Sequence, residues 1–178
     1  MSELARAVEE AQSLVKKVLG DIPAVHGSSV NTQGMSLDPA GDTMKLEYMV
    51  TLLDIPSSPK LKALSADFTL ETCLSRMSEG LRLYSGLLQV LVGRLASPQK
   101  VTELHADLKD LQAQVHKIQE LSQVSILEAQ TDVSGLSSRL TGDYEVQVAT
   151  HVTLAHLRSF SQDAFRSLRN IGQTRSSS

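Results

Sequence analysis

A near-perfect helical periodicity between Cys73 and Leu95 constrains the fold more than any other part of the chain. Apolar side chains recur there at alternating spacings of three and four residues, which places them on one face of a helix. They are Leu74, Met77, Leu81, Tyr84, Leu88, Leu91 and Leu95. A helix with such a face is built to pack against other helices, so the segment predicts one member of a helical bundle.

The composition favours helix packing over a sheet core. Of the 178 residues, 41% are hydrophobic, yet only 3% are aromatic and none is tryptophan. A chain of this length is the natural size for one domain with a substantial core. Its aliphatic composition is typical of an all-α protein. We therefore expect a single helical domain over residues 1–178.

The charge pattern and the hydropathy argue against two kinds of partner. The formal net charge is −3, and the basic residues are scattered along the sequence rather than grouped in a stripe. We therefore expect no nucleic acid partner. No apolar run approaches the roughly 18 to 20 residues of a membrane span, so we expect no membrane insertion. The opening Met-Ser-Glu-Leu lacks the features of a secretory signal. If the protein is secreted, we expect this sequence to be its mature or recombinant form.

The periodicity recurs along the chain and predicts five helices separated by polar connections. Gly20 and Pro23 are expected to weaken or kink the first of them. Ser97 is expected to cap the fourth, with Pro98 as its first residue. The tail 173–178 is expected to be disordered. The helices are expected at about 3–26, 44–54, 67–95, 98–121 and 143–171.

The lengths of the connections, long then short then long, predict the topology. A short link such as 96–99 forces neighbouring helices to run antiparallel, whereas a long crossover lets consecutive helices lie parallel. The four long helices therefore predict an up-up-down-down four-helix bundle with two long crossover loops. The short helix at 44–54 falls within the first crossover.

Two of the predicted helices resemble the granulocyte colony-stimulating factor family of long-chain four-helix cytokines, in the interleukin-six superfamily. The letters CLS, GL, LY and GLLQ stand at family positions between Cys73 and Gln89, and HL, SF and RxLR do so between His156 and Arg169. Weaker matches lie at 16–21 and around Leu104. These segments cover most of the helical chain, which is identified as a divergent or engineered member of the family.

The resemblance implies a secreted cytokine or growth factor without catalytic activity or cofactor. It would bind and dimerise a class I cytokine receptor, the granulocyte colony-stimulating factor receptor, with two cytokine and two receptor chains in the complex. The implied outcome is JAK/STAT signalling and granulocyte production, and the free chain is expected to be monomeric. The alternative is another interleukin-six-type helical cytokine with a different receptor.

The resemblance places a major receptor-binding surface on the exposed faces of the first and third long helices. On the latter, Asp107 and Asp110 lie one turn apart in a polar stripe, so both carboxylates can face a basic receptor patch. A solvated face is the simpler interpretation. Ser13 stands where the family has a glutamate, and Glu9 and Glu10 are close enough to compensate. The candidates are Glu10, Ser13, Leu14, Lys16, Lys17, Glu103, Asp107, Asp110, Gln114 and Lys117.

A second receptor-binding surface is implied near the short helix and the start of the last one. Tyr144 aligns with a family aromatic that reaches another receptor chain, although a tyrosine there could equally cover the end of the bundle. The acidic contact of the family falls at Lys45 or Glu47, depending on a one-residue choice of register. We select Glu47, with Tyr48 beside it.

The family's two disulfides are absent. Cys73 remains where one cysteine is expected, while Ala63 and Val30 occupy other aligned cysteine positions. We therefore expect the first crossover to be less ordered than the helices. Cys73 is either an inert core thiol or one that pairs two molecules.

Enzymatic chemistry finds no support in the sequence, which has no glycine-rich phosphate loop or nucleophile elbow. His105 and His116 lie three turns apart, too far for one metal ion, and His151 and His156 lack nearby cysteine or acidic ligands. We therefore expect no metal site. A lipid-carrying bundle would have lysine-fringed apolar faces, and the faces of this chain carry mixed charge instead.

Overall fold

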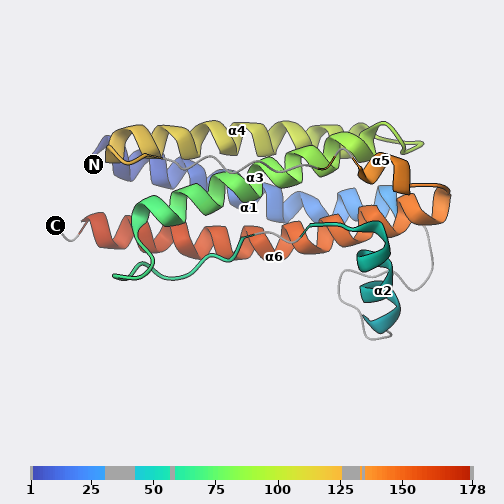
Figure 1. Ribbon diagram of the computed structural model, residues 1–178. Helices are drawn as coiled ribbons and strands as arrows, with labels where there is room; N and C mark the ends of the chain where they lie inside the picture. The colour runs from blue at the N-terminus through green and yellow to red at the C-terminus, as the bar shows by residue number, and fades with distance from the viewer. Residues whose placement is uncertain (1, 31–42, 57–58, 126–132, 134, 177–178) are drawn as a thin grey trace.

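The computed structural model describes residues 2–30, 43–56, 59–125, 133 and 135–176, with the side chains of 43–47 and 174–176 outside the description. Figure 1 shows the helices of these residues, four long and two short. They are α1 (Glu3–Ser29), α2 (Thr43–Leu53), α3 (Leu70–Val92), α4 (Gln99–Ser122), α5 (Leu136–Arg139) and α6 (Asp143–Ser176).

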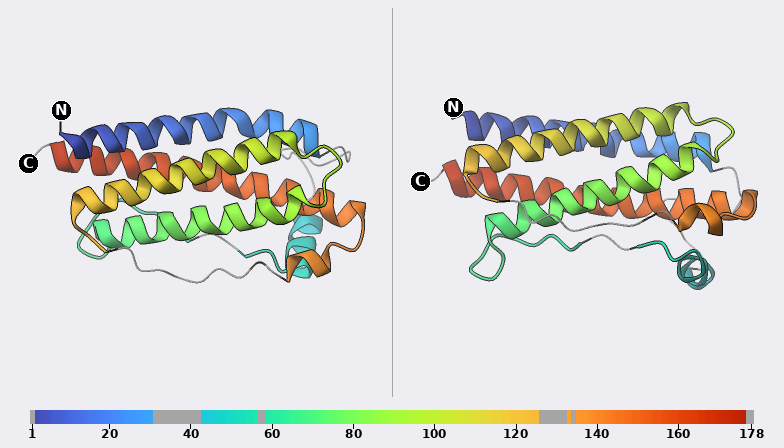
Figure 2. Two further views of the ribbon diagram at one scale, coloured as in Figure 1. Left: turned by 90° about the horizontal axis from the view of Figure 1, so that it is seen from above. Right: turned by 45° about the horizontal axis from the view of Figure 1, so that its top comes forward.

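The long helices form the predicted bundle. Helices α1 and α3 run in one direction, and α4 and α6 run in the other (Figures 1 and 2). Each of α1 and α3 packs against both α4 and α6. The up-up-down-down topology expected from the connection lengths is therefore confirmed, with α2 in the first crossover. Within the described residues, no helix has the length and apolarity that a membrane span requires.

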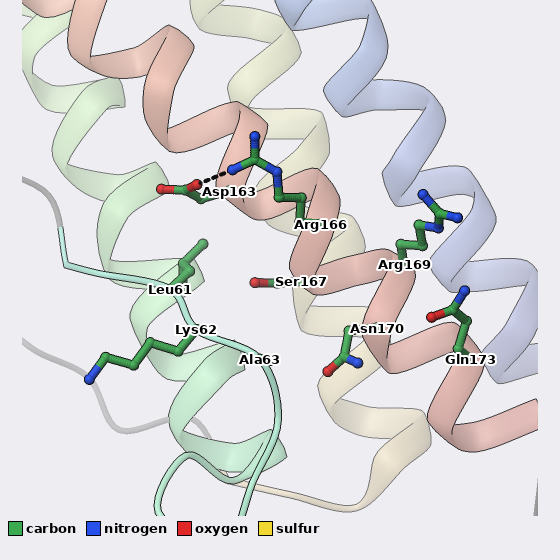
Figure 3. Close-up of a pocket in the computed structure, with 9 residues that line it drawn as sticks. All are labelled: Leu61, Lys62, Ala63, Asp163, Arg166, Ser167, Arg169, Asn170 and Gln173. Atoms are coloured by element: carbon green, nitrogen blue, oxygen red, sulfur yellow. Dashed lines mark hydrogen bonds and ion pairs between the residues drawn. The ribbon is translucent and has the colours of Figure 1, made fainter.

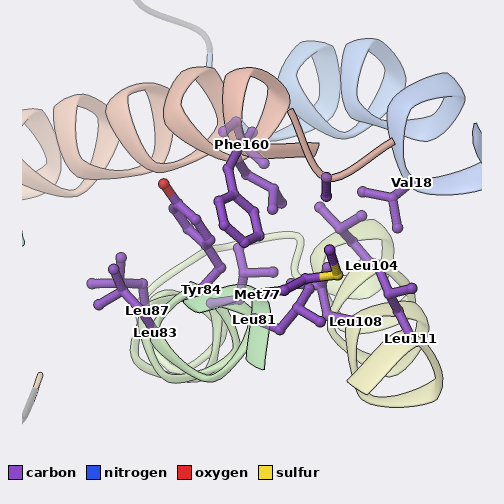
Figure 4. Close-up of a cluster of buried hydrophobic side chains, with 14 of the residues drawn as sticks. Val18, Met77, Leu81, Leu83, Tyr84, Leu87, Leu104, Leu108, Leu111 and Phe160 are labelled. Atoms are coloured by element: carbon purple, nitrogen blue, oxygen red, sulfur yellow. The ribbon is translucent and has the colours of Figure 1, made fainter. Parts of the chain in front are cut away.

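The core is made by the apolar faces that the periodicity predicts. On α3, six of the seven predicted positions are buried, and Leu95 lies beyond the helix, partly buried against the core. Figure 4 shows the ring of Phe160 pointing from α6 toward α3, where it lies beside Tyr84 and above Met77 and Leu81. The rings of Tyr84 and Phe160 lie 5.5 Å apart between centroids. This aromatic contact joins α3 to α6 where α4 closes the other side with Leu104, Leu108 and Leu111.

Gly80 allows α3 and α6 to approach closely at this contact. A Cβ atom placed on Gly80 would lie 2.3 Å from Cζ of Phe160. That separation is far below van der Waals contact, so any side chain at position 80 requires the Phe160 ring to move. The packing of α3 against α6 therefore explains why glycine stands at position 80, in the Gly80-Leu81 pair that matches the family.

Helix α3 begins later and ends earlier than the predicted 67–95. Ser65 and Phe68 exchange two backbone hydrogen bonds in a turn that precludes an earlier start, and Thr69 caps the first turn by accepting from the amide of Thr72. At the other end, the chain turns at Gly93. The predicted end at Leu95 was wrong because the apolar spacing continues beyond the last helical turn. The predicted start at 67 was wrong because the turn from Ser65 to Phe68 comes before the helix.

The start of α4 also differs from the prediction. Pro98 occupies the cap position, Gln99 is the first helical residue, and no side chain caps the helix, so Ser97 is not the cap. The carbonyl of Pro98 accepts from the amide of Thr102 at 2.8 Å and from its hydroxyl at 2.9 Å. A capping side chain at Ser97 is one residue too early to reach this first turn.

Helices α1 and α6 are longer than predicted. Helix α1 continues through Gly20 and Pro23 to Ser29, because Ile22 and Val25 extend its buried face. Helix α6 continues to Ser176, so the part of the tail predicted as disordered is helical from 173 to 176. The short α5 was not predicted. It is held by burial of Leu136, with Leu140 buried just after it.

Candidate functional site

The predicted major surface lies along the seam between α1 and α4, which run antiparallel. We call it the α1–α4 face. It comprises Glu10, Ser13, Leu14, Lys17, Glu103, Asp107, Asp110, Gln114 and Lys117. Hydrogen bonds from Lys17 and Gln114 join the two helices along this face, and they decide which polar groups are available to a partner.

The first contact joins Lys17 and Asp107. Lys17 Nζ donates to Asp107 Oδ1 at 2.7 Å. The hydrogen bond to Asp107 and the charge of its carboxylate raise the pKa of Lys17 above its ordinary value. Asp107 is only 7% exposed, so the expectation that its carboxylate is open to a partner was wrong. Residues three apart on a helix differ by about 60° around its axis, and this rotation turns Asp107 into the seam while Asp110 stays outside it.

The second contact joins Gln114 to α1. Its Nε2 lies 3.1 Å from the Ala7 carbonyl oxygen and 3.1 Å from Glu10 Oε2. Glu10 and Gln114 are therefore brought together, as the sequence analysis expected for one surface. Their bonds fix the relative position of α1 and α4.

The remaining polar residues of the α1–α4 face point outward. Ser13, Glu103, Asp110 and Lys117 are exposed, whereas Leu14 is partly buried against the core. Lys16 lies elsewhere: its Nζ sits 5.4 Å from the centre of the Phe165 ring on α6. Adjacent helical residues point about 100° apart, so Lys16 turns toward α6 while Lys17 turns toward α4. Lys16 therefore lies beside the α1–α4 face, and its role in receptor binding stays a prediction.

The second predicted surface contains three exposed apolar side chains. Tyr48 is 66% exposed, Leu52 is 56% exposed and Tyr144 is 41% exposed, and these are the exposed large hydrophobic residues of the part that the structure describes. We call them the α2–α6 patch, since α2 packs against α6 at the end of the bundle where α6 begins (Figures 1 and 2). Glu47 and Lys45 lie in α2, with side chains outside the description.

Leu52 was missed by the sequence analysis. Met49 and Leu53 are the buried anchors of α2, and Arg139 Nε donates to the Leu53 carbonyl at 2.6 Å. Leu52 stands one turn after Tyr48, so both lie on the outer side of the helix. The four-residue spacing between them was a usable signal.

Comparison with known proteins finds matches to proteins of one name from three species. Human granulocyte colony-stimulating factor is 28% identical over 171 residues, which cover 91% of this chain and 80% of the human protein. The cat protein of the same name is 29% identical over 122 residues, covering 67% of this chain and 61% of its own. The dog protein is 27% identical over 124 residues, covering 68% and 69%. No protein-family model matches the chain.

The chain is similar to granulocyte colony-stimulating factor. With the helical bundle, this similarity supports a cytokine or growth factor of the granulocyte colony-stimulating factor and interleukin-six type. Cytokines of that type are not enzymes.

Cys73 distinguishes this chain from the disulfide pattern that the resemblance implies. It is a free thiol with no exposed surface. Burial raises the pKa of Cys73 to about 11, and a hydrogen bond with Ser167 acts in the opposite direction. A buried protonated thiol is a poor nucleophile and cannot reach another molecule while α3 stays packed, which favours the inert interpretation. Of the first crossover, 31–42 and 57–58 lie outside the described residues, and its predicted low order stays a prediction.

Two histidines form a buried pair that the sequence analysis did not connect. His26 Nε2 and His151 Nδ1 lie 2.9 Å apart across the α1–α6 interface, so one ring donates to the other. One turn away, Gln147 Nε2 donates to the Ser29 carbonyl at 3.0 Å. Within the described ranges, no group of three or more His, Cys, Asp or Glu side chains could hold a metal ion. The pair is therefore a polar contact inside the bundle.

Proposed function

We propose that this chain is a secreted cytokine that binds and dimerises a class I cytokine receptor, the granulocyte colony-stimulating factor receptor. Signalling would proceed through JAK/STAT and promote granulocyte production. The observation that carries the proposal is the similarity over 91% of the chain, on a bundle whose α1 and α4 present one joined polar face. The chain itself would perform no catalysis and use no cofactor.

In this proposal, the α1–α4 face contacts the cytokine-binding module of one receptor chain. The exposed carboxylates of Glu103 and Asp110 offer negative charge to basic receptor side chains. Asp107 has a different role from the one first expected: it holds Lys17 in place beside them. Glu10 and Gln114 fix the spacing of the two helices.

The α2–α6 patch would contact the immunoglobulin-like domain of another receptor chain. Exposed tyrosines are efficient anchors because each buries a large, rigid surface while its hydroxyl keeps a hydrogen-bond partner. Tyr48 and Tyr144 therefore act as the anchors, with Leu52 beside Tyr48 and Glu47 on the same helix. Two cytokine and two receptor chains would form the complex from monomeric free chains.

Charge reversal at Asp110 tests the α1–α4 face. We expect Asp110→Lys to weaken binding to the purified receptor ectodomain by at least about tenfold, because an exposed attractive charge becomes repulsive. Surface plasmon resonance measures the affinity, and circular dichroism checks that helicity is unchanged. Asp67→Lys, an equal charge change at an exposed site before α3, is the control and should bind normally.

Equal weakening by both variants would show a general charge effect and remove the α1–α4 face from the proposal. Failure of the unaltered chain to bind would leave the alternative, an interleukin-six-type cytokine with a different receptor. Asp107→Lys is a poorer test because it would set a second ammonium beside Lys17 inside the seam.

Truncation of the tyrosines tests the α2–α6 patch. We expect the double change Tyr48→Ala and Tyr144→Ala to leave the first receptor contact within about twofold but to weaken assembly of the larger complex by about tenfold or more. Light scattering after gel filtration measures the assembly. Gln162→Ala, at an exposed position of α6, is the control. A double variant that assembles as well as the unaltered chain would exclude the patch.

A further inference from the structure

A groove lies between the segment 61–63 and the second half of α6 (Figure 3). Its volume is about 430 Å³. The backbone amide of Leu64 donates to Asn170 Oδ1 at 2.9 Å and holds the segment against the helix. The groove thus has two fixed walls, one an extended backbone and the other a helix.

Basic side chains line this groove. Lys62, Arg166 and Arg169 are exposed along it, in a chain whose overall charge is −3. Among the described lining residues Asp163 is the acidic one, and it accepts from Arg166 Nη1 at 3.0 Å. Exposed ion pairs of this kind contribute about 0 to 1 kcal/mol, so a stronger anion can displace the carboxylate. Figure 3 shows Lys62 on one wall of the groove and Arg166 and Arg169 on the other, with their charged ends pointing away from one another. All three side chains are exposed and can turn toward a ligand.

Further positive charge lies next to the groove. Arg76 Nη1 donates to the Lys60 carbonyl at 3.2 Å, and its guanidinium lies 5.2 Å from the centre of the Phe68 ring. Lys60 is exposed. These contacts bring α3 and the segment before it to the same side of the molecule. The basic residues are scattered along the sequence, but the fold brings Lys62 close to Arg166 and Arg169, about a hundred positions away, on one groove.

We propose that this groove binds a linear sulfated polysaccharide. Guanidinium groups form paired hydrogen bonds with the oxygens of such anions, and two arginines line the groove. None of the described residues that line it is aromatic, so they offer no stacking platform for the bases of a nucleic acid. It also lacks the apolar face that a membrane surface requires, since Leu61 and Ala63 are its apolar members.

Heparin, used as the probe, tests the proposal by isothermal titration over a range of salt concentrations. We expect Arg166→Glu combined with Arg169→Glu to weaken binding by at least about tenfold and to reduce the slope of log K against log salt by roughly two, one for each lost contact. The matched control combines Lys100→Glu with Lys109→Glu. These residues are exposed on α4, which lies diagonally across the bundle from α6, and the net charge changes equally.

Three further results would overturn the proposal. They are equal weakening by the two double variants, equal binding of heparin from which the sulfates have been removed, and absence of heparin binding by the unaltered chain. Stronger binding to a single-stranded oligonucleotide or to vesicles containing phosphoinositide would assign the groove to another class of anion. Circular dichroism shows whether each variant retains its helices, and Arg166→Gln with Arg169→Gln replaces the first variant if it does not.

Discussion

Shortening Phe160 to alanine is expected to lower the free energy of unfolding by about 3 to 5 kcal/mol, one of the two largest effects we predict for this chain. The ring is 3% exposed and touches Tyr84 and the backbone at Gly80. Its removal opens a cavity between α3 and α6 that the neighbouring leucines cannot fill without leaving their rotamers. Urea unfolding followed by circular dichroism measures the loss.

The opposite change at the same contact is Gly80→Ala. Alanine normally stabilises a helix by about 0.5 to 1 kcal/mol relative to glycine. Here its Cβ would lie 2.3 Å from Phe160, and overpacking of a core costs about 1 to 3 kcal/mol. We therefore expect net destabilisation. Gly20→Ala is the control, because nothing lies within 4 Å of a Cβ at that position of α1, and it should stabilise the chain.

The two changes are expected to compensate each other. In the double variant, the methyl group added at position 80 enters the space that the Phe160 ring leaves, so the combined loss should be smaller than the sum of the single losses by about 0.5 to 3 kcal/mol. If the losses of the two single variants simply add in the double variant, the close approach of α3 and α6 at Gly80 is not what limits the side chain at position 80.

The fold could be predicted from the sequence because bundle packing requires a periodic pattern of apolar residues. Apolar residues must return to one face every three or four positions, so six of the seven positions predicted for α3 are buried, although Leu83 and Leu87 are buried too and fall outside the predicted spacing. The close approach at Gly80 was not, because it depends on which ring of α6 stands opposite. Helix ends were also unpredictable in part, since Thr69 and Pro98 act through cap geometry that spacing does not encode.

The candidate surfaces were predictable as stripes but not as individual contacts. Asp107 and Asp110 are about 60° apart around the helix axis, and that difference separates a buried carboxylate paired with Lys17 from an exposed one. Whether α1 supplies a lysine opposite Asp107 depends on the register of two antiparallel helices. The same reasoning explains why the basic groove and the His26–His151 pair, each joining distant segments, left no local signal.

That histidine pair leads to the second prediction of large effect, a loss of stability on mild acidification. Burial lowers the pKa of both His26 and His151, and the charges of His26 and His156 lower the pKa of His151 further. In the unfolded chain an imidazole has a pKa of about 6.5. Above that pH both histidines are neutral in the folded and in the unfolded chain, so the folded chain keeps its full free energy of unfolding.

As the pH falls below about 6.5, the unfolded chain takes up protons that the folded chain resists, so the free energy of unfolding decreases until the folded pKa values are reached. Burial also lowers the pKa of His105 and His156, which add to the same trend. Urea unfolding at about pH 7.5 and about pH 5.5 measures the change, a window in which exposed carboxylates scarcely titrate.

Two variants separate the pair from the other histidines. His26→Leu alone leaves a buried ring nitrogen of His151 without its partner and should cost about 1 to 3 kcal/mol at neutral pH. The double change His26→Leu and His151→Leu removes both polar groups, so it should recover much of that loss and flatten the pH dependence. If the double variant loses as much stability on acidification as the unaltered chain, the pH dependence arises elsewhere. Recovery with a flattened profile would show that the buried His26–His151 pair between α1 and α6 couples the stability of the bundle to pH.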